Sequence, residues 1–143
     1  MSVYTRRAPV TITCNKRLAA YVEQEVKALG FETEETFVTG IRLYCSINDC
    51  IRLNLNLRCV SQVLYSLKQF DAVNADDIYK NLVNYPWETI LPDNGYFSVT
   101  SNVLNPTINN SMLLHALDHL VSTRKIVKRG HRYKLRRKEQ KAD

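Results

Sequence analysis

Hydrophobic and polar positions alternate near the start of the chain in the pattern of a β-strand. In PVTITC, residues 9–14, apolar residues alternate with threonines, which is the period of a half-buried strand. The next stretch, KRLAAYVEQEVKALG at residues 16–30, predicts an amphipathic helix, with Asn15 as its N-cap and Gly30 where a C-terminal cap is expected. Its apolar positions are Leu18, Tyr21, Val22, Val26 and Leu29.

Two short strands are predicted after this helix, in FETEETFV and IRLYC, which are separated at Thr39 and Gly40. The second strand has one apolar face and one polar face. Its residues divide into Ile41, Leu43 and Cys45 on one side and Arg42 and Tyr44 on the other.

The following segment, INDCIRLNLNLR at residues 47–58, fits two structures. Every second residue from Ile51 to Leu57 is apolar, as in a strand, whereas Ile47, Ile51 and Leu55 also keep the i, i+4 row of a helix. Periodicity alone favours the strand.

The stretch LRCVSQVLYSLKQF, residues 57–70, alternates again and predicts another strand that has Arg58 at its start. NADDIYKNLVNYPW then predicts a helix that Asn74 caps and Pro86 stops.

Three patterns complete the chain. YFSVTSNV, residues 96–103, predicts a strand with Phe97 and Val99 on its core face. Residues 111–122 are helical in their spacing, and KIVKRGHRYKL, residues 125–135, predicts a hairpin that turns near its glycine.

Composition indicates a folded protein, and charge separates the end of the chain from the rest. Of 143 residues, 45% are hydrophobic and 24% are charged, which is the balance of a globular domain. Residues 1–123 hold 10 Lys and Arg against 12 Asp and Glu, net −2, whereas residues 124–143 hold 10 against 2, net +8. Such a basic block attracts RNA or DNA through counterion release, and a solvated chain end is the alternative.

Neither a signal peptide nor an apolar stretch long enough to cross a bilayer is present, so we expect a cytoplasmic protein without a membrane partner. The cysteines have no C-x-x-C spacing and lie among apolar neighbours, so they are expected to be reduced core thiols. They are Cys14, Cys45, Cys50 and Cys59.

Motifs for catalysis are missing from the sequence. The four glycines are isolated, so no glycine-rich loop for a nucleotide cofactor is present. His115 and His119 are four residues apart on a predicted helix, but no third metal ligand can be assigned, and ordinary histidines are favoured. Asn105 and Pro106 begin like the Asn-Pro-Pro-aromatic motif that holds a nucleobase amine, but Thr107 follows. We therefore predict no catalytic residue and no metal site.

Four stretches, taken in order, carry a resemblance to a known family. They are TCNKRLAAYVEQEVKALGF, LNLRCVSQVLYSL, FDAVNADDIYKNLVNYPWETILPDNGYFSV with its Trp87 and Glu88 pair, and TINNS. Over about residues 9–111 the chain resembles the N-terminal region of the bacterial THUMP-containing ribosomal RNA methyltransferases, the guanine-N2 enzymes of large-subunit ribosomal RNA. Those proteins begin with a ferredoxin-like segment, enter a THUMP RNA-binding domain and end in a separate S-adenosylmethionine-dependent catalytic domain.

The resemblance implies an α+β fold with a ferredoxin-like segment at residues 1–45, a partial THUMP domain with a mixed sheet and packed helices at residues 46–123, and a basic tail at residues 124–143. It also implies a helix at about residues 47–56. The match ends after Ser111, and the catalytic motifs are absent. S-adenosylmethionine is therefore expected only in a catalytic domain outside this chain, and no cofactor is expected in the chain itself.

The resulting hypothesis is an RNA-binding module that holds structured large-subunit ribosomal RNA against a catalytic methyltransferase domain, so that it contributes proximity. Basic side chains would contact phosphates, and recognition would depend on RNA shape. Arg58 has an alternative role as a helix cap or as the partner of a carboxylate. The predicted RNA-binding residues are Arg6, Arg7, Lys16, Arg17, Arg58, Lys125, Lys128, Arg129, Arg132, Arg136 and Arg137.

An alternative hypothesis assigns the activity to the basic C-terminal region. A helix at residues 112–123 followed by the hairpin KIVKRGHRYKL has the outline of a winged-helix end. This outline would make the chain a DNA-binding or assembly module.

Overall fold

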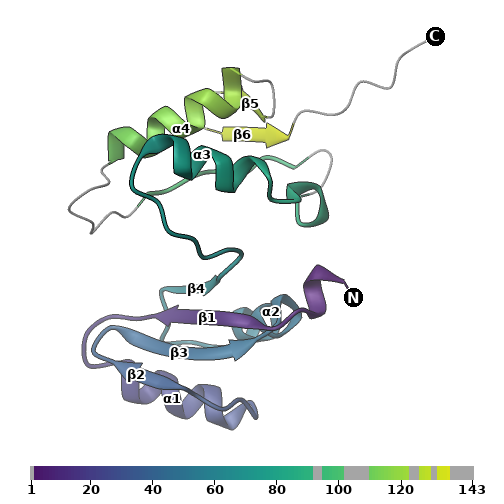
Figure 1. Cartoon of the computed structure of the whole chain (residues 1–143). Helices are drawn as coiled ribbons and strands as arrows, with labels where there is room; N and C mark the ends of the chain where they lie inside the picture. Colours follow the sequence, from purple (N-terminus) through teal and green to yellow (C-terminus); the bar gives the residue numbers. More distant parts are fainter. Residues whose placement is uncertain (1, 92–94, 102–109, 123–125, 130–131, 136–143) are drawn as a thin grey trace. The chain divides into compact units, whose positions relative to one another are not determined.

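The computed structural model describes residues 2–91, 95–101, 110–122, 126–129 and 132–135. The chain divides into two compact units, residues 1–69 (unit 1) and 70–143 (unit 2) (Figure 1). Each unit has its own buried hydrophobic cluster. Among the described residues, no helix is both long and apolar enough to span a membrane.

Unit 1 is a four-stranded antiparallel sheet combined with two α-helices. The strand order is β2-β3-β1-β4, with β1 paired to both β3 and β4. This βαββαβ succession is the ferredoxin-like arrangement, so the predicted α+β class and ferredoxin-like start are confirmed. The elements are η1 (Val3–Thr5), β1 (Ala8–Thr13), α1 (Ala19–Ala28), β2 (Glu35–Phe37), β3 (Gly40–Cys45), α2 (Ile47–Asn56) and β4 (Gln62–Tyr65).

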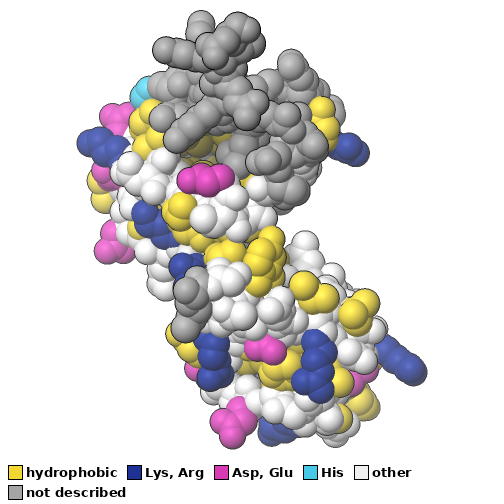
Figure 2. Space-filling model, turned by 90° about the vertical axis from the view of Figure 1, so that its right-hand side faces the viewer, with side chains coloured by type: hydrophobic (Ala, Val, Ile, Leu, Met, Phe, Trp, Pro, Cys, Tyr) yellow, Lys and Arg dark blue, Asp and Glu magenta, His cyan; other side chains and the backbone are white. Residues whose placement is uncertain are grey.

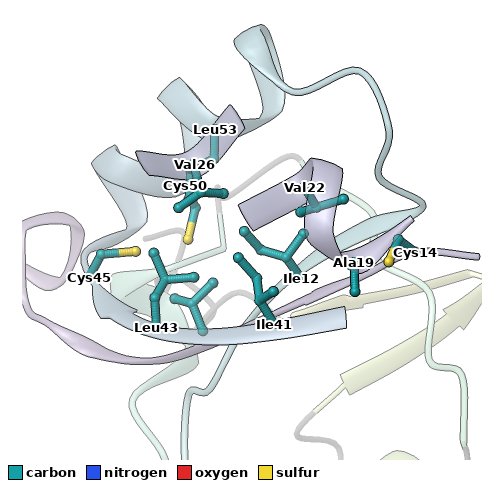
Figure 3. Packing of buried hydrophobic residues seen from close by; sticks show 11 residues of the cluster. Ile12, Cys14, Ala19, Val22, Val26, Ile41, Leu43, Cys45, Cys50 and Leu53 are labelled. Carbon is teal, nitrogen blue, oxygen red and sulfur yellow. The ribbon is translucent and has the colours of Figure 1, made fainter. Parts of the chain in front are cut away.

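The core of unit 1 lies between one face of the sheet and both helices. The register places Val10 opposite Leu43 and Ile12 opposite Ile41, and all four side chains are fully buried. The alternating patterns therefore predicted the inward faces of β1 and β3 correctly. Figure 3 shows the helical side chains that pack on this face, and the helices contribute Ala19, Val22, Val26, Cys50 and Leu53.

Helix α1 begins later than its sequence pattern predicted. Arg17 has a positive φ of 73°, which interrupts a helix, and α1 starts at Ala19 without a side-chain cap from Asn15. Gly30 ends it as predicted, with a φ of 92° that suits glycine. Tyr21, which the pattern assigned to the apolar face, is 59% exposed.

Residues Ile47–Asn56 form helix α2, as the family resemblance implied, and the strand favoured by periodicity is wrong. A strand would place Ile51, Leu53 and Leu55 on the same face. In the helix only Leu53 of these is buried, whereas Ile51 and Leu55 are 52% and 80% exposed. Both helices of unit 1 pack on the sheet. A residue of α2 is therefore buried only where the helical turn brings its side chain toward the sheet, as at Cys50 and Leu53.

A capping box explains why α2 begins where it does. The Ser46 hydroxyl accepts the Asp49 backbone N–H at 3.2 Å, and the Asp49 carboxylate accepts the Ser46 backbone N–H at 3.0 Å. Cys45 precedes the cap and Cys50 lies in the first turn of the helix, which are the positions of a hydrophobic staple. These contacts satisfy the free N–H groups at the helix start.

Strand β4 determines where unit 1 ends. It pairs with β1, with Val63 opposite Ile12, and it is shorter than the strand predicted over residues 57–70. The predicted boundary after residue 45 therefore differs from the structure, in which unit 1 continues to residue 69. Unit 1 extends this far because β4 pairs with β1 in the sheet and α2 packs in the same core as β1.

Unit 2 contains two packed helices and a hairpin. Asn74 caps α3 through the Asp77 backbone N–H at 2.9 Å, as the sequence predicted. Leu120, Ile126 and Tyr133 form its buried cluster. The elements are α3 (Ala75–Val83), η2 (Trp87–Thr89), α4 (Asn110–Ser122), β5 (Ile126–Arg129) and β6 (Arg132–Leu135), which confirms the C-terminal helix and hairpin.

The strand predicted at residues 96–103 is reduced to one bridge in the described part of the segment. Phe97 exchanges two backbone hydrogen bonds with Tyr133, at 2.8 and 2.7 Å, and packs on the buried cluster. Val99, predicted to face the core, is 45% exposed. Residues 102 and 103 lie outside the described residues.

Candidate nucleic-acid interface

The basic residues predicted near the N-terminus fall at two opposite ends of the sheet in unit 1. Arg6 and Arg7 precede β1, whereas Lys16 and Arg17 follow it. Strand β1 has six residues, so its ends are about 20 Å apart. The five predicted cations of unit 1 therefore do not form one cluster.

Arg6 and Arg7 are held in place by backbone carbonyls on the two sides of β1. The Arg6 Nη2 donates to the Leu67 carbonyl at 3.3 Å, beyond the end of β4. The Arg7 Nη2 donates to the Tyr44 carbonyl of β3 at 2.7 Å, and its Cζ lies 5.2 Å from the centroid of the Tyr44 ring. Both arginines remain exposed.

Arg58 lies in the α2–β4 loop, which reaches the end of β1 that Lys16 and Arg17 follow. The Ser61 backbone N–H donates to the Thr13 carbonyl at 2.7 Å, which brings the α2–β4 loop to the end of β1. The backbone N–H groups of Arg58 and Cys59 approach the Glu25 carboxylate at 3.3 and 3.4 Å. Glu25 thus contacts the backbone of this loop, and the Arg58 side chain is exposed.

The C-terminal cations are only partly described. Lys128 and Arg129 belong to β5, and the register places Arg129 opposite the exposed Arg132 of β6. The remaining predicted contacts lie outside the described residues: Lys125, Arg136 and Arg137.

The sequence reasoning did not select two arginines that the structure places in specific contacts. Arg42 donates to the Glu35 carboxylate of the paired strand β2 at 2.9 Å. Arg52 donates to the Leu29 carbonyl at 2.8 Å, and its Cζ lies 5.3 Å from the centroid of the Phe31 ring. Arg42 shares the polar side of β3 with Tyr44, and this alternation was the signal that could have identified it.

Figure 2 shows how charge is distributed over one face of the described residues. Lys and Arg side chains alternate with hydrophobic and acidic ones and do not merge into one continuous patch. On the face drawn, the described cations therefore form separate small groups.

All four cysteines have free thiols, as predicted, and three of them are buried. A hydrogen bond to Cys50 and burial raise the pKa of the Cys45 thiol, whereas the bond from Cys45 lowers the pKa of Cys50. Burial, followed by the proximity of Cys59, raises the pKa of Cys14. These contacts fit packing roles in the core.

Glu23 connects α1 to the edge strand β2. Its carboxylate accepts hydrogen bonds from the Lys27 ammonium at 2.7 Å and the Thr36 hydroxyl at 3.1 Å. These bonds, that of Lys27 first, lower the pKa of Glu23. Lys27 is thus a cation with a protein partner.

His119 has a structural role in unit 2. Its ring stacks on that of Tyr79 with centroids 4.0 Å apart and an interplanar angle of 14°, which joins α4 to α3. Within the part of the chain that the structure describes, no group of three or more potential metal ligands is present.

The strand order and the two helices on one face define unit 1 as a ferredoxin-like domain. Residues 10–64 match the family model of the RlmL ferredoxin-like domain, so this region is a domain of that type. The matched residues begin in β1 and end in β4, so they include residues of all four strands.

Curated relatives extend the similarity beyond this domain. The ribosomal RNA large subunit methyltransferase K/L of Psychromonas ingrahamii is 29% identical over 96 residues, which cover 67% of this chain and 13% of that protein. The protein of the same name from Pseudomonas putida W619 is 30% identical over 105 residues, which cover 73% and 14%. The resemblance to ribosomal RNA methyltransferases is confirmed, and the chain spans 13–14% of the length of these relatives.

Solved structures share the fold across both units. A possible methylase from Clostridium difficile 630 has a TM-score of 0.60 at 17% identity, covering 82% of this chain and 33% of that chain. A predicted N6-adenine-specific DNA methylase from Listeria monocytogenes has a TM-score of 0.58 at 24% identity, covering 82% and 32%. Unit 1 accounts for less than half of this chain, so the shared fold includes elements of unit 2.

Proposed function

We propose that this chain is the RNA-binding module of an S-adenosylmethionine-dependent ribosomal RNA methyltransferase, with a THUMP-like role for unit 2. It holds structured large-subunit ribosomal RNA for a catalytic domain that lies outside the chain. The observation that carries the proposal is the similarity of 67–73% of the chain to ribosomal RNA large subunit methyltransferases K/L.

The exposed cations support this role in a specific way. Arg6 and Arg7 lie at one end of the sheet in unit 1, and Lys16, Arg17 and Arg58 lie at the other. Two basic groups about 20 Å apart suit phosphates on separate turns or strands of a folded RNA, and they do not suit one short contact. Recognition of this kind depends on the shape of the RNA.

Binding of a large-subunit ribosomal RNA hairpin to the whole chain, measured across a salt series, tests the proposal. The logarithm of the binding constant is expected to fall linearly with the logarithm of salt concentration because bound phosphates release counterions. Arg6→Gln with Arg7→Gln, or Lys16→Gln with Arg17→Gln, should each reduce the slope by about 2.

Lys27→Gln is the matched control, because Lys27 is already paired with Glu23. It should leave both the affinity and the salt slope near their original values. An affinity that does not change with salt would contradict the proposal.

A second candidate, a winged-helix-like DNA-binding or assembly module, has one observation in its favour. Helix α4 and the hairpin β5–β6 are present, and Phe97 adds a backbone bridge to Tyr133. In the same binding assay, Arg129→Gln with Arg132→Gln distinguishes the two, because this change leaves the buried Ile126 and Tyr133 in place. Loss of duplex DNA binding with unchanged RNA binding would favour this second candidate.

A further inference from the structure

The sheet of unit 1 has a face that neither of its helices covers. The register places Glu35, Arg42, Thr11 and Leu64 in one row across the four strands, on the side opposite the buried cluster. Tyr44 is 44% exposed, next to this row on β3. The face therefore combines an aromatic ring, an aliphatic side chain and basic groups.

Arg7 and Tyr44 form a preorganised stack at one corner of this face. The Arg7 guanidinium lies over the Tyr44 ring, with 5.2 Å from Cζ to the centroid, and donates to the Tyr44 carbonyl at 2.7 Å. Two contacts to one residue fix the plane of the guanidinium, and Arg7 remains exposed. A planar ligand can stack on such a pair with little further loss of side-chain freedom.

The segment that carries Arg7 is itself fixed to β4. The Tyr65 hydroxyl donates to the Arg6 carbonyl at 2.8 Å, and the Arg6 guanidinium donates to the Leu67 carbonyl at 3.3 Å. Arg6 and Arg7 are thus tied to the strands on both sides of β1. The Arg6 guanidinium is therefore held on the β4 side of β1, and the Arg7 guanidinium is held on the β3 side.

The charge of this corner favours an anionic partner. Among the residues of these four described strands, Glu35 is the one acidic side chain, and its carboxylate pairs with Arg42 at 2.9 Å. The one acidic side chain of these strands is therefore already paired, and the two arginines that precede β1 add positive charge.

We propose that the corner of the open sheet face formed by Arg6, Arg7 and Tyr44 binds an unpaired, single-stranded segment of RNA. One base stacks on the Arg7–Tyr44 pair, and Arg6 contacts an adjacent phosphate. Exposed aromatic rings on four-stranded sheets, and arginine planes, stack unpaired bases, whereas duplex RNA keeps its base faces covered. This inference rests on the proposed function, and it adds which form of RNA is bound and where on unit 1 it binds.

The experiment uses the whole chain and a single-stranded RNA of about eight nucleotides, which contains an adenine analogue whose fluorescence is quenched by stacking. Tyr44→Ala is expected to weaken binding about tenfold, to remove the quenching and to leave the salt slope unchanged, because a neutral ring releases no counterion. Arg7→Ala should weaken binding and also reduce the slope by about 1. Tyr44→Phe should bind like the original chain.

Two matched controls come from the side of unit 1 that carries the helices. Arg52 has the same local arrangement as Arg7, with 5.3 Å to the Phe31 ring centroid and 2.8 Å to the Leu29 carbonyl. Tyr21 on α1 is 59% exposed. Arg52→Ala and Tyr21→Ala should leave single-strand affinity unchanged. If Tyr44→Ala does not fold, Tyr44→Val replaces it, because valine favours a strand and lacks a ring.

The outcomes separate this inference from the proposed function. Single-strand binding that Tyr44→Ala and Arg7→Ala do not change overturns the inference. Binding of the ribosomal RNA hairpin without binding of the single strand also overturns it, and the proposed function then stands. Binding of neither RNA overturns both.

Discussion

At the residue scale, Gly40 meets a steric requirement of the sheet. A Cβ on Gly40 would lie 2.1 Å from the Ile12 carbonyl oxygen and 3.2 Å from Cε2 of Phe37. The oxygen belongs to β1, which pairs with β3 along its whole length, so it cannot move away without disturbing the pairing. At Gly30 the backbone conformation, with a φ of +92°, is what disfavours a side chain, because a Cβ there would meet no atom within 4 Å.

Gly40→Ala should lower the free energy of unfolding by about 3 kcal/mol, as overpacking against rigid groups does. Gly30→Ala should cost about 1 kcal/mol, which is the cost of a left-handed conformation for alanine. Urea unfolding followed by circular dichroism measures both. Equal losses for the two variants would contradict the steric explanation.

At the residue scale the candidate site also shows what a sequence pattern misses. Arg58 marked the family resemblance, and the structure uses its backbone N–H, at 3.3 Å from the Glu25 carboxylate. Arg7 was predicted only as a phosphate contact, yet its guanidinium lies over Tyr44, which is 37 residues away in the sequence. Such a contact depends on strand pairing, so local reading could not find it. RNA contact by the predicted arginines and lysines stays a prediction.

At the scale of elements, the stability of α2 depends on the cap at its N-terminus. Ser46 is 7% exposed, and its hydroxyl accepts the Asp49 backbone N–H at 3.2 Å. Removing it leaves a donor at the helix start without its partner in a site that has little access to water. The sequence alone could have predicted this cap, because Ser46 and Asp49 have capping-box spacing just before the apolar residues of α2.

Ser46→Ala should therefore lower the free energy of unfolding by about 1 kcal/mol, while Ser46→Thr should keep most of the cap. Asn48→Ala, an exposed change in the same turn, is the control and should alter stability little. Thermal unfolding of the three variants is the measurement. A Ser46→Ala variant as stable as Asn48→Ala would show that the cap does not hold α2.

At the scale of the whole molecule, two cores stabilise two units. Leu53 is fully buried in the cluster of unit 1, and Leu120 is 6% exposed in the cluster of unit 2. The two clusters share no residue. Each unit should therefore respond to a cavity in its own core.

Leu53→Ala and Leu120→Ala should each cost about 2–5 kcal/mol of stability in the unit that contains the change. Amide hydrogen exchange on the whole chain should show protection lost in unit 1 for the first variant and in unit 2 for the second. A loss of protection across both units from either change would show that the chain unfolds as one cooperative body.

The sequence by itself determined the elements whose period or caps are local: β1, the inward face of β3, the end of α1 at Gly30, the start of α3 at Asn74, and the C-terminal helix and hairpin. Periodicity misassigned α2, because alternation along residues 51–57 carries no information about what covers those residues. Only the tertiary structure decided that β4 pairs beside β1, that unit 1 runs to residue 69, and that Arg7 stacks on Tyr44. These features join residues far apart in the sequence, and strand pairing is what brings them together.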